Sequence, residues 1–445
     1  MTTKDSERTS AAIGGPIAQS AEDYAAVRVP PAERQSTLDI SLVRMGLTVS
    51  ASDLVFGYTL GLYFGFWQAV TISLVISLIV LAISVGMGAI GVRERLTLAL
   101  ATRFAFGRQG SRLPSLVTAI VIGLFYGYIL AITISVFPAA SSTVARVVYC
   151  VLLGGLFVLI SGLGFDRGLK WMGRIGVPLM ILLVIVADVV TIVDAGGFSE
   201  ILSAHPAKSG QMAVLAIMGL GISKWTGGAL VSPDITRFGK GMKSVWISTG
   251  AEFVLGNFAF NLLGLILGLG LKSSDLGAAF GLIGLTWLAT VAFLFQGTTV
   301  STNMLYAASL SSANVVGLPR KITNLVVGIL GIVIAYWGLT QGVINSFLTF
   351  IGYIGYALPA IPAIILADYF ILHKMRYSAP IESLPMVNWR AIAALIVTVG
   401  LNVFAGLVLD DEFWRVLPVL GAIVYLVFSA PQVWAAWRTP TPSAV

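Results

Sequence analysis

Long apolar segments recur along nearly the whole chain, and they constrain its fold more than any other feature. From Leu38 onward, runs of about 18 or more mainly apolar residues follow one another. A helix of about 20 such residues crosses the hydrocarbon core of a bilayer. Only 11% of the residues are charged, against about 25% in soluble proteins. The pattern therefore predicts an all-α membrane protein.

The apolar segments predict twelve transmembrane helices. The expected spans are residues 38–63, 67–92, 113–137, 144–163, 172–194, 212–236, 244–270, 277–311, 322–338, 342–372, 388–409 and 414–437. Residues 1–37 are polar and lack an apolar core, so we expect a cytoplasmic N-terminal tail and no cleavable signal peptide.

The positive charges fall mainly on one side of the predicted membrane. Of the 27 Lys and Arg residues, the opposite side carries Arg146, Lys208, Lys272 and Arg415, and Lys224 lies inside a span. The others, with Arg44 counted in the tail, share the side of the termini. The positive-inside rule then predicts a multi-pass protein of the cell (inner) membrane with both termini cytoplasmic. The basic charge reflects topology, and no nucleic-acid partner is expected.

The sixth span contains an unusual stretch, GLGISKWTGGALVSPDITRF at Gly219–Phe238. It places Lys224 and Trp225 at membrane depth, and Gly227, Gly228 and Pro233 should weaken the helix. Irregular backbone at this depth is tolerated only when it is buried in protein or lines a cavity. The stretch is either a broken helix at a substrate site or a kinked packing helix whose lysine reaches an interface.

The first span, MGLTVSASDLVFGYTLGLYFG, has a similar design, with Asp53 followed by Gly57 and Gly61. The two spans lie five helices apart. This predicts two five-helix halves of opposite topology, residues 38–194 and 212–372, with accessory helices in 388–437. Interrupted helices at matching positions indicate a transporter site at the midplane. Asp53 and Lys224 should then face each other, either as an ion pair or as groups that contact the substrate or titrate during transport.

Other residues leave alternatives open. Gln296, Thr298, Thr299, Ser301, Thr302 and Asn303 form a polar run in the eighth span that suits either cation ligation or interhelical hydrogen bonding. Phe125, Tyr126 and Tyr128 of the third span could stack on a planar ligand or serve only packing. Asp188 and Asp234, near span ends, are expected to be structural, and Glu252 has no assigned role.

Three further segments bear on the architecture. Residues Leu96–Phe106 form either an amphipathic helix or a charged loop. The tenth span should bend at Gly352, Gly355, Pro359 and Pro362, as a gate or as an ordinary kink. The histidines lie in loops, and the chain has neither a P-loop nor a dinucleotide fingerprint. We therefore expect a non-enzymatic protein driven by an ion gradient.

Several stretches together resemble the nucleobase–cation symporter-1 family, most closely its bacterial cytosine-permease branch. They are RMGLT near Met45, TRFAFGRQGSRLPSL at Thr102–Leu116, PDITRFG at Pro233–Gly239, LYAASLSSANVVGL at Leu305–Leu318 and ADYF at Ala367–Phe370. The resemblance implies twelve helices, of which the first ten form the inverted-repeat fold of sodium symporters. It also implies cation-coupled uptake of a planar heterocycle by alternating access.

The resemblance also implies site residues. The ligand would lie between the rings of Phe125 and Trp225, with the Gln296 amide, Gly227, Lys224 and Asp53 around it. A sodium ion would be held by the carbonyls of Gly46, Val49 and Gln296 and by the Thr299 hydroxyl.

This chain departs from the cytosine branch at four positions. Ile122 stands in place of a glutamine, Lys224 in place of a small hydroxyl residue, Asp53 in place of a small residue and Val300 in place of a second hydroxyl ligand. The coupling ion, sodium or proton, stays open. Proton coupling, if used, would involve the Asp53–Lys224 pair.

The leading hypothesis is a secondary transporter that imports a nucleobase or a related planar nitrogen heterocycle. The alternatives are a passive channel and a membrane receptor that binds without translocation. The expected partners are the heterocycle and the lipid bilayer, with no other cofactor and no obligate protein partner.

Overall fold

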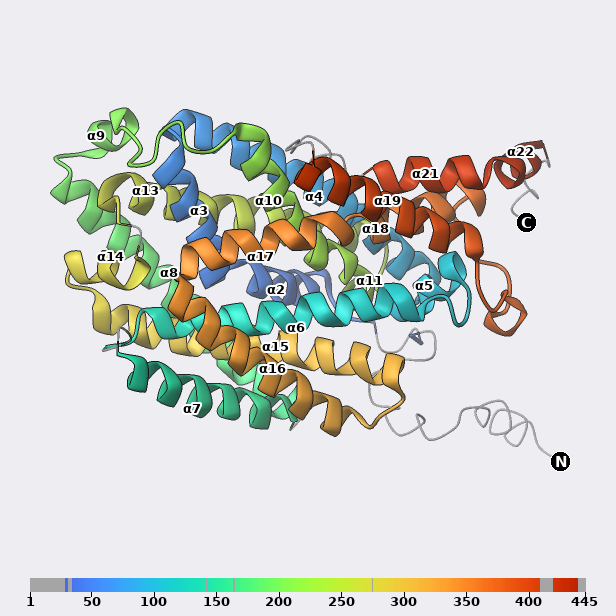
Figure 1. Ribbon diagram of the computed structural model, residues 1–445, viewed down its shortest axis with the longest axis horizontal. Coiled ribbons are helices and arrows are strands. Elements are labelled where there is room, and N and C mark those ends of the chain that lie inside the picture. Colours follow the sequence, from blue (N-terminus) through green and yellow to red (C-terminus); the bar gives the residue numbers. More distant parts are fainter. Residues whose placement is uncertain are drawn as a thin grey trace.

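The computed structural model describes residues 29–30, 34–138, 140, 142–162, 165–273, 275–408 and 419–438. Every regular element in these ranges is helical. Figure 1 shows the long helices lying side by side, roughly along the long axis of the molecule. The predicted all-α fold is confirmed.

The helices follow the predicted order. The first eight are α2 (Thr37–Thr48), α3 (Ala51–Tyr63), α4 (Phe66–Glu94), α5 (Leu98–Phe106), α6 (Arg112–Ser135), α7 (Thr143–Gly162), α8 (Phe165–Asp194) and α9 (Phe198–Ser203). The next are α10 (Val214–Leu230), α11 (Ser232–Thr236), α12 (Met242–Gly250), π-helix η3 (Ala251–Phe258), α13 (Ala259–Leu271), α14 (Leu276–Leu282) and α15 (Thr286–Val316). The last are α16 (Arg320–Gln341), α17 (Val343–Ala357), α18 (Ala360–Ala367), π-helix η4 (Asp368–Leu372), 3-10 helix η5 (Ile381–Ser383), α19 (Trp389–Val408), α21 (Leu420–Phe428) and α22 (Ala430–Arg438).

Nine helical segments of the described chain are long and apolar enough to cross a membrane. They become ten if α2 and α3, bent by 52° at their junction, count as one span. The polar run of the 31-residue α15 lowers its hydropathy. Residues 414–418 of the expected twelfth span lie outside the described residues, and the rest of that span forms α21 and α22. The count of twelve stays a prediction.

The expected eighth span, 277–311, is wrong in its boundaries. Residues Leu276–Leu282 form the separate helix α14, and α15 begins only at Thr286. The cause is Gly284, whose φ of +70° ends α14 while the amide of Leu285 donates to the carbonyl of Phe280 at 2.9 Å. Glycine adopts this left-handed conformation without the strain a side chain would add. At its other end the helix runs on to Val316.

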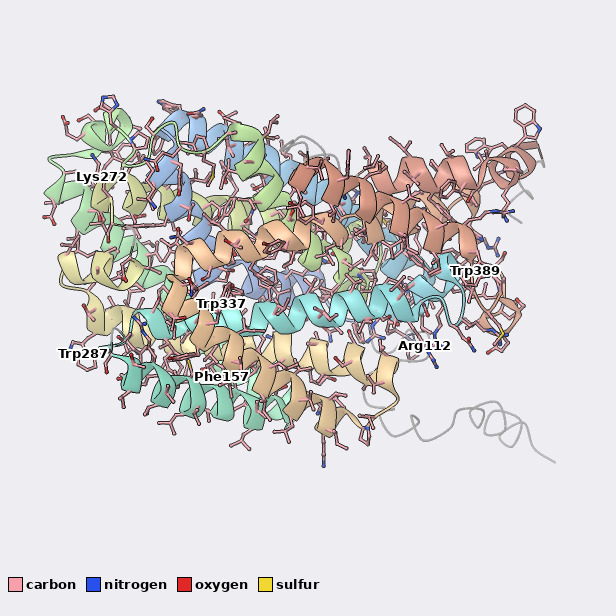
Figure 2. The ribbon with its side chains drawn as sticks, viewed as in Figure 1. Arg112, Phe157, Lys272, Trp287, Trp337 and Trp389 are labelled. Carbon is pink, nitrogen blue, oxygen red and sulfur yellow. The ribbon has the colours of Figure 1, made fainter. Side chains whose placement is uncertain are left out.

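The helices form two packing groups. In one, α3 packs on α13, α10 on α4, and α2 on η3; in the other, α6, α7, α15 and α16 pack on one another. Helix α8 contacts both α13 and α15, so it joins the two groups. Figure 2 shows Arg112 and Trp389 at one end of the molecule and Lys272 and Trp287 at the other. This agrees with the loops assigned to each side, while the identity of the cytoplasmic side stays a prediction.

The first span is interrupted, as its similarity to the sixth predicts, but the interruption does not lie at Gly57 and Gly61. Helix α3 runs unbroken through both glycines, which lie against the backbone of α13. A Cβ atom at Gly57 would lie 2.1 Å from the carbonyl oxygen of Asn261, and Gly264 and Gly268 approach α3 as closely. Small residues let membrane helices pack backbone to backbone. These glycines therefore serve helix contact.

Gly57→Ala should strongly destabilise the protein, because the added methyl group meets main chain that cannot rotate away. Overpacking of this kind costs about 1–3 kcal/mol or more. We expect a lower unfolding temperature in detergent and less monodisperse protein. Gly250→Ala is the control, since no atom lies within 4 Å of its added Cβ. Equal unfolding temperatures for the two variants would contradict this packing.

The segment Leu96–Phe106 contains a helix, α5, from Leu98 to Phe106, rather than only a charged loop. Thr97 caps α5 through the amide of Leu100, and Asp234 accepts a hydrogen bond from the amide of Leu98 at 2.9 Å. Asp234 therefore has a structural role.

The tenth span is interrupted between Ala357 and Ala360, at Pro359, as its prolines indicate.

The ADYF motif anchors the last helices. The carboxylate of Asp368 accepts hydrogen bonds from the hydroxyls of Tyr377 (3.0 Å) and Tyr425 (2.7 Å), and His373 lies 3.2 Å from it. Burial lowers the pKa of His373, but the hydrogen bond and charge of Asp368 outweigh this and leave that pKa above its ordinary value. The motif thus ties η4 to α21.

Candidate substrate site

The first span breaks at Val49 and Ser50, and Ser50 lies seven residues before Gly57. Ser50 is the N-cap of α3: its hydroxyl accepts from the amide of Asp53 at 3.3 Å and donates to the Asp53 carboxylate at 2.7 Å. Serine favours the N-cap because its oxygen satisfies a free amide of the first turn. The local sequence Ser50–Asp53 therefore starts a new helix.

Gln296 of α15 clamps this break. Its Nε2 donates to the carbonyl of Val49 at 3.2 Å, and its Oε1 accepts from the amide of Ala51 at 3.3 Å. Gly176 of α8 lets the backbone at Gln296 approach closely. Backbone groups released by a break need such partners inside a membrane protein. The expected ligand-binding amide is thus occupied by the protein's own main chain in this conformation.

Gln296→Leu should destabilise the break, because it removes two buried hydrogen bonds worth about 0.5–1.5 kcal/mol each and leaves their partners unsatisfied. We expect faster hydrogen–deuterium exchange at the amides from Val49 to Asp53, followed by mass spectrometry. Thr340→Leu is a surface control, since the Thr340 hydroxyl is exposed and bonds only within its own helix. Unchanged exchange in Gln296→Leu would exclude the clamp.

Asp53 joins Lys224 and Trp225 of α10. Its Oδ1 atom accepts hydrogen bonds from Lys224 Nζ and from Trp225 Nε1, the latter at 2.9 Å. The Lys224 ammonium also lies 4.9 Å from the centre of the Trp225 ring and 5.4 Å from that of Phe56. All of these side chains are buried. The predicted ion pair between the first and sixth spans is confirmed.

The sixth span is interrupted within the predicted stretch Gly219–Phe238, although α10 continues through Lys224 and both glycines to Leu230. The interruption comes at Val231, two residues before Pro233, which lacks an amide hydrogen for the helix ladder. Gly228 makes room for the Trp225 ring, since its Cβ would lie 2.7 Å from ring carbon Cε3. Gly227 faces Leu358 beside the interruption in the tenth span.

Phe125 lies in the same buried core cluster as Trp225, and α6 contacts α10. Its ring packs edge-on against Phe350 and Phe347 of α17, with centroids 5.3 and 6.5 Å away. The aromatic residues of α17 surround this side of the site, and sequence reasoning missed them.

Of the expected cation ligands, Val49 and Gln296 are in direct contact at this break. Gly46 and Val49 lie at the end of α2, and the Thr299 hydroxyl lies on α15 about one turn from Gln296. That hydroxyl donates to the carbonyl of Phe295 at 3.1 Å, which leaves its lone pairs for a ligand. The Val49 carbonyl, however, already accepts from Gln296. Within the described residues no cluster of three His, Cys, Asp or Glu side chains could hold a metal.

A second buried ion pair was not predicted. Arg44 lies inside α2 rather than in the tail, so counting it among the tail charges was wrong. Its Nη2 donates to the Glu252 carboxylate of η3, to Ser84 of α4 at 2.7 Å and to Ser232 of α11 at 3.2 Å. Its position in the RMGLT stretch was the available signal. The pair holds four helices of one packing group together.

Comparison with known proteins identifies the family. A family model described as "Permease for cytosine/purines, uracil, thiamine, allantoin" matches residues 28–428. The cytosine permease of Escherichia coli (strain K12) is 27% identical over 384 residues, covering 85% of this chain and 87% of that protein. The cytosine permease of Escherichia coli O157:H7 matches over the same lengths with the same identity.

Solved structures share the fold. Mhp1, a nucleobase-cation-symport-1 family transporter with bromovinylhydantoin bound in a closed conformation, has a TM-score of 0.70 at 17% identity and covers 94% of this chain and 98% of its own. Inward-facing Mhp1 has a TM-score of 0.75 at 16% identity, with coverages of 93% and 94%. A Na+-coupled sialic acid symporter has a TM-score of 0.67 at 12% identity, with coverages of 95% and 94%.

The family model spans almost the whole chain, and the solved structures independently give the same helical architecture. The family resemblance seen in the sequence is confirmed. The chain therefore belongs to the family of permeases for cytosine/purines, uracil, thiamine and allantoin, and it is a membrane transporter rather than an enzyme.

Proposed function

We propose that this permease imports a nucleobase or a related planar nitrogen heterocycle by cation-coupled alternating access. The observation that carries the proposal is the buried meeting of Asp53, Lys224 and Trp225 beside a broken helix. Relatives named cytosine permeases, and the similarity to both closed and inward-facing Mhp1, support the same function.

The site residues suggest how such a ligand would bind. Trp225 offers a flat face whose orientation is held by the bond from its indole N–H to Asp53. Phe125 offers a second ring from α6, and Gly227 lies beside Leu358, where an added Cβ would be 3.5 Å from Cδ2 of that leucine. Lys224 would donate to ring carbonyls or to an anionic form of the ligand, and Asp53 would accept from amino groups. Ile122, a buried apolar side chain, replaces an amide contact of the cytosine branch, so the substrate would differ from cytosine.

Further features of the proposal concern the ion and the membrane. A sodium ion would use Gly46, Val49, Gln296 and Thr299, and it would compete with the Gln296 amide for the Val49 carbonyl. The alternative coupling ion is a proton. The protein would lie in the cell (inner) membrane with both termini cytoplasmic, and residues 38–194 and 212–372 would form its two inverted halves.

Proteoliposomes containing the purified protein test this function. We expect saturable counterflow of at least one purine, pyrimidine, hydantoin or vitamin-like heterocycle, with accumulation when a sodium or pH gradient is imposed. Empty liposomes and liposomes with an unrelated membrane protein are the controls. Unsaturable flux that ignores ion gradients would favour a channel. Binding without flux would favour a receptor, and the absence of both would reject the proposal.

A further inference from the structure

Asp188 of α8 is a buried carboxyl group whose oxygens lack hydrogen-bond partners. The residue is only 4% exposed, and neither Oδ1 nor Oδ2 meets a donor among the described residues. Sequence position suggested a structural residue near water, but the side chain points into the protein. This differs from Asp53 and Glu252, whose carboxylates each accept from a cationic side chain.

A second polar group lies one turn away and shares this property. Thr191 is buried, and its hydroxyl has no hydrogen-bond partner among the described residues. Buried threonines elsewhere in the bundle donate to the carbonyl four residues earlier, as Thr133 and Thr226 do. The methyl group of Thr191 instead lies against Gly270 of α13. The two side chains form a small polar spot on an otherwise apolar helix face.

Among the described residues, no charged side chain forms an ion pair or hydrogen bond with Asp188. Helix α15 contains no acidic or basic residue, and its ionisable side chain is Tyr306. The described charge nearest the end of α13 is the exposed Lys272. On the other contacting helices, Glu200 of α9 is exposed and Arg146 of α7 bonds to the carbonyl of Ala140. Asp194, on α8 itself, is exposed. An isolated carboxylate in such surroundings is so unfavourable that the group takes up a proton instead.

The position of Asp188 would link its protonation to a relative shift of the two packing groups. Asp188 lies six residues before the end of α8, which is about 9 Å of helix. Because α8 contacts α13 in one packing group and α15 in the other, a shift between the groups would change the surroundings of Asp188. The carboxyl would be neutral when enclosed, as here, and would release its proton when water reaches it.

We propose that Asp188 is a proton-binding site of the transport cycle. The proposal rests on the proposed function of the protein as a coupled importer. The proton would pass between water and the Asp188 carboxylate, with no other bond made or broken. The Asp53–Lys224 pair, held by complementary charges and by Ser50 and Trp225, would then remain an ion pair through the cycle.

Asp188→Asn tests the site, because the amide copies the shape of the neutral acid and cannot release a proton. In sodium-free proteoliposomes, a gradient of one pH unit supports roughly tenfold accumulation in the wild type if one proton accompanies each substrate. We expect Asp188→Asn to keep counterflow of the same substrate and to lose this accumulation. Asp194→Asn, exposed on the same helix, should behave like the wild type.

The outcomes separate the two proposals. Without transport by the wild type, the proposed function fails. If the wild type transports but Asp188→Asn still accumulates substrate under the pH gradient, or if the wild type ignores that gradient, only the Asp188 site is overturned.

A second measurement needs no variant. Dicyclohexylcarbodiimide reacts with protonated carboxyl groups in apolar surroundings, so peptide mass spectrometry should find Asp188 labelled and Asp53 unlabelled, with labelling of Asp188 falling at alkaline pH. Lack of label at Asp188 in folded protein would overturn the site even if Asp188→Asn does not fold.

Discussion

Replacing Trp225 by alanine should weaken substrate binding by roughly 5- to 150-fold, because stacking of a planar base on an aromatic ring is worth about 1–3 kcal/mol. The indole is buried beside Lys224, and its N–H bond to Asp53 fixes the plane of the ring before a ligand arrives. A radiolabelled heterocycle, binding to detergent-solubilised protein, would give the dissociation constants of wild type and variant.

Two companion variants interpret this result. Trp225→Phe keeps a stacking face but loses the bond to Asp53, so its affinity should fall between those of wild type and Trp225→Ala. Trp246→Ala removes a tryptophan that is 56% exposed on α12 and should leave affinity unchanged. Unchanged affinity in Trp225→Ala would remove this ring from the site.

Removing Asp53 alone should cause the largest loss of stability. In Asp53→Ala, the ammonium group of Lys224 would stay buried without its counter-charge, and Trp225 would lose its hydrogen-bond acceptor. Breaking a buried ion pair at one partner costs about 3–5 kcal/mol. We expect a markedly lower unfolding temperature, measured with a thiol-reactive or intrinsic-fluorescence assay in detergent.

The double variant Asp53→Ala with Lys224→Met should recover much of this stability, because it removes both charges. Lys272→Met, which alters an exposed lysine, is the matched control. A double variant as unstable as Asp53→Ala would show that the Asp53 bonds to Trp225 and Ser50 matter more than the charge of Lys224.

Lys224→Ala tests whether the ion pair itself carries a coupled proton. If it does, this variant should lose the pH dependence of uptake. If Asp188 binds the proton instead, Lys224→Ala should keep that dependence while Asp188→Asn loses it. Initial uptake rates at several external pH values, measured for both variants, decide between the two carboxyl groups.

The sequence by itself predicted the features that depend on residue type along one helix. Apolar length predicted the spans, and the rarity of charges inside spans singled out Asp53 and Lys224, because an unpaired charge is so unfavourable there. The same unfavourable free energy of an unpaired buried charge predicted that Asp53 and Lys224 pair with each other. The short family motifs identified the family, which the comparisons confirmed.

Only the tertiary structure decided the functions of residues that have two possible uses. Glycine weakens a helix and also allows close helix contact, so the role of Gly57 depends on α13 lying against it. An amide can bind a ligand or cap a break, and Gln296 caps the break because α15 crosses the first span there. Arg44 was counted among the tail charges, but it forms a buried ion pair with Glu252. Asp188 was expected to lie near water, but neighbouring helices bury it. In each case the partner comes from a distant part of the chain, and spacing along one helix carries no information about it.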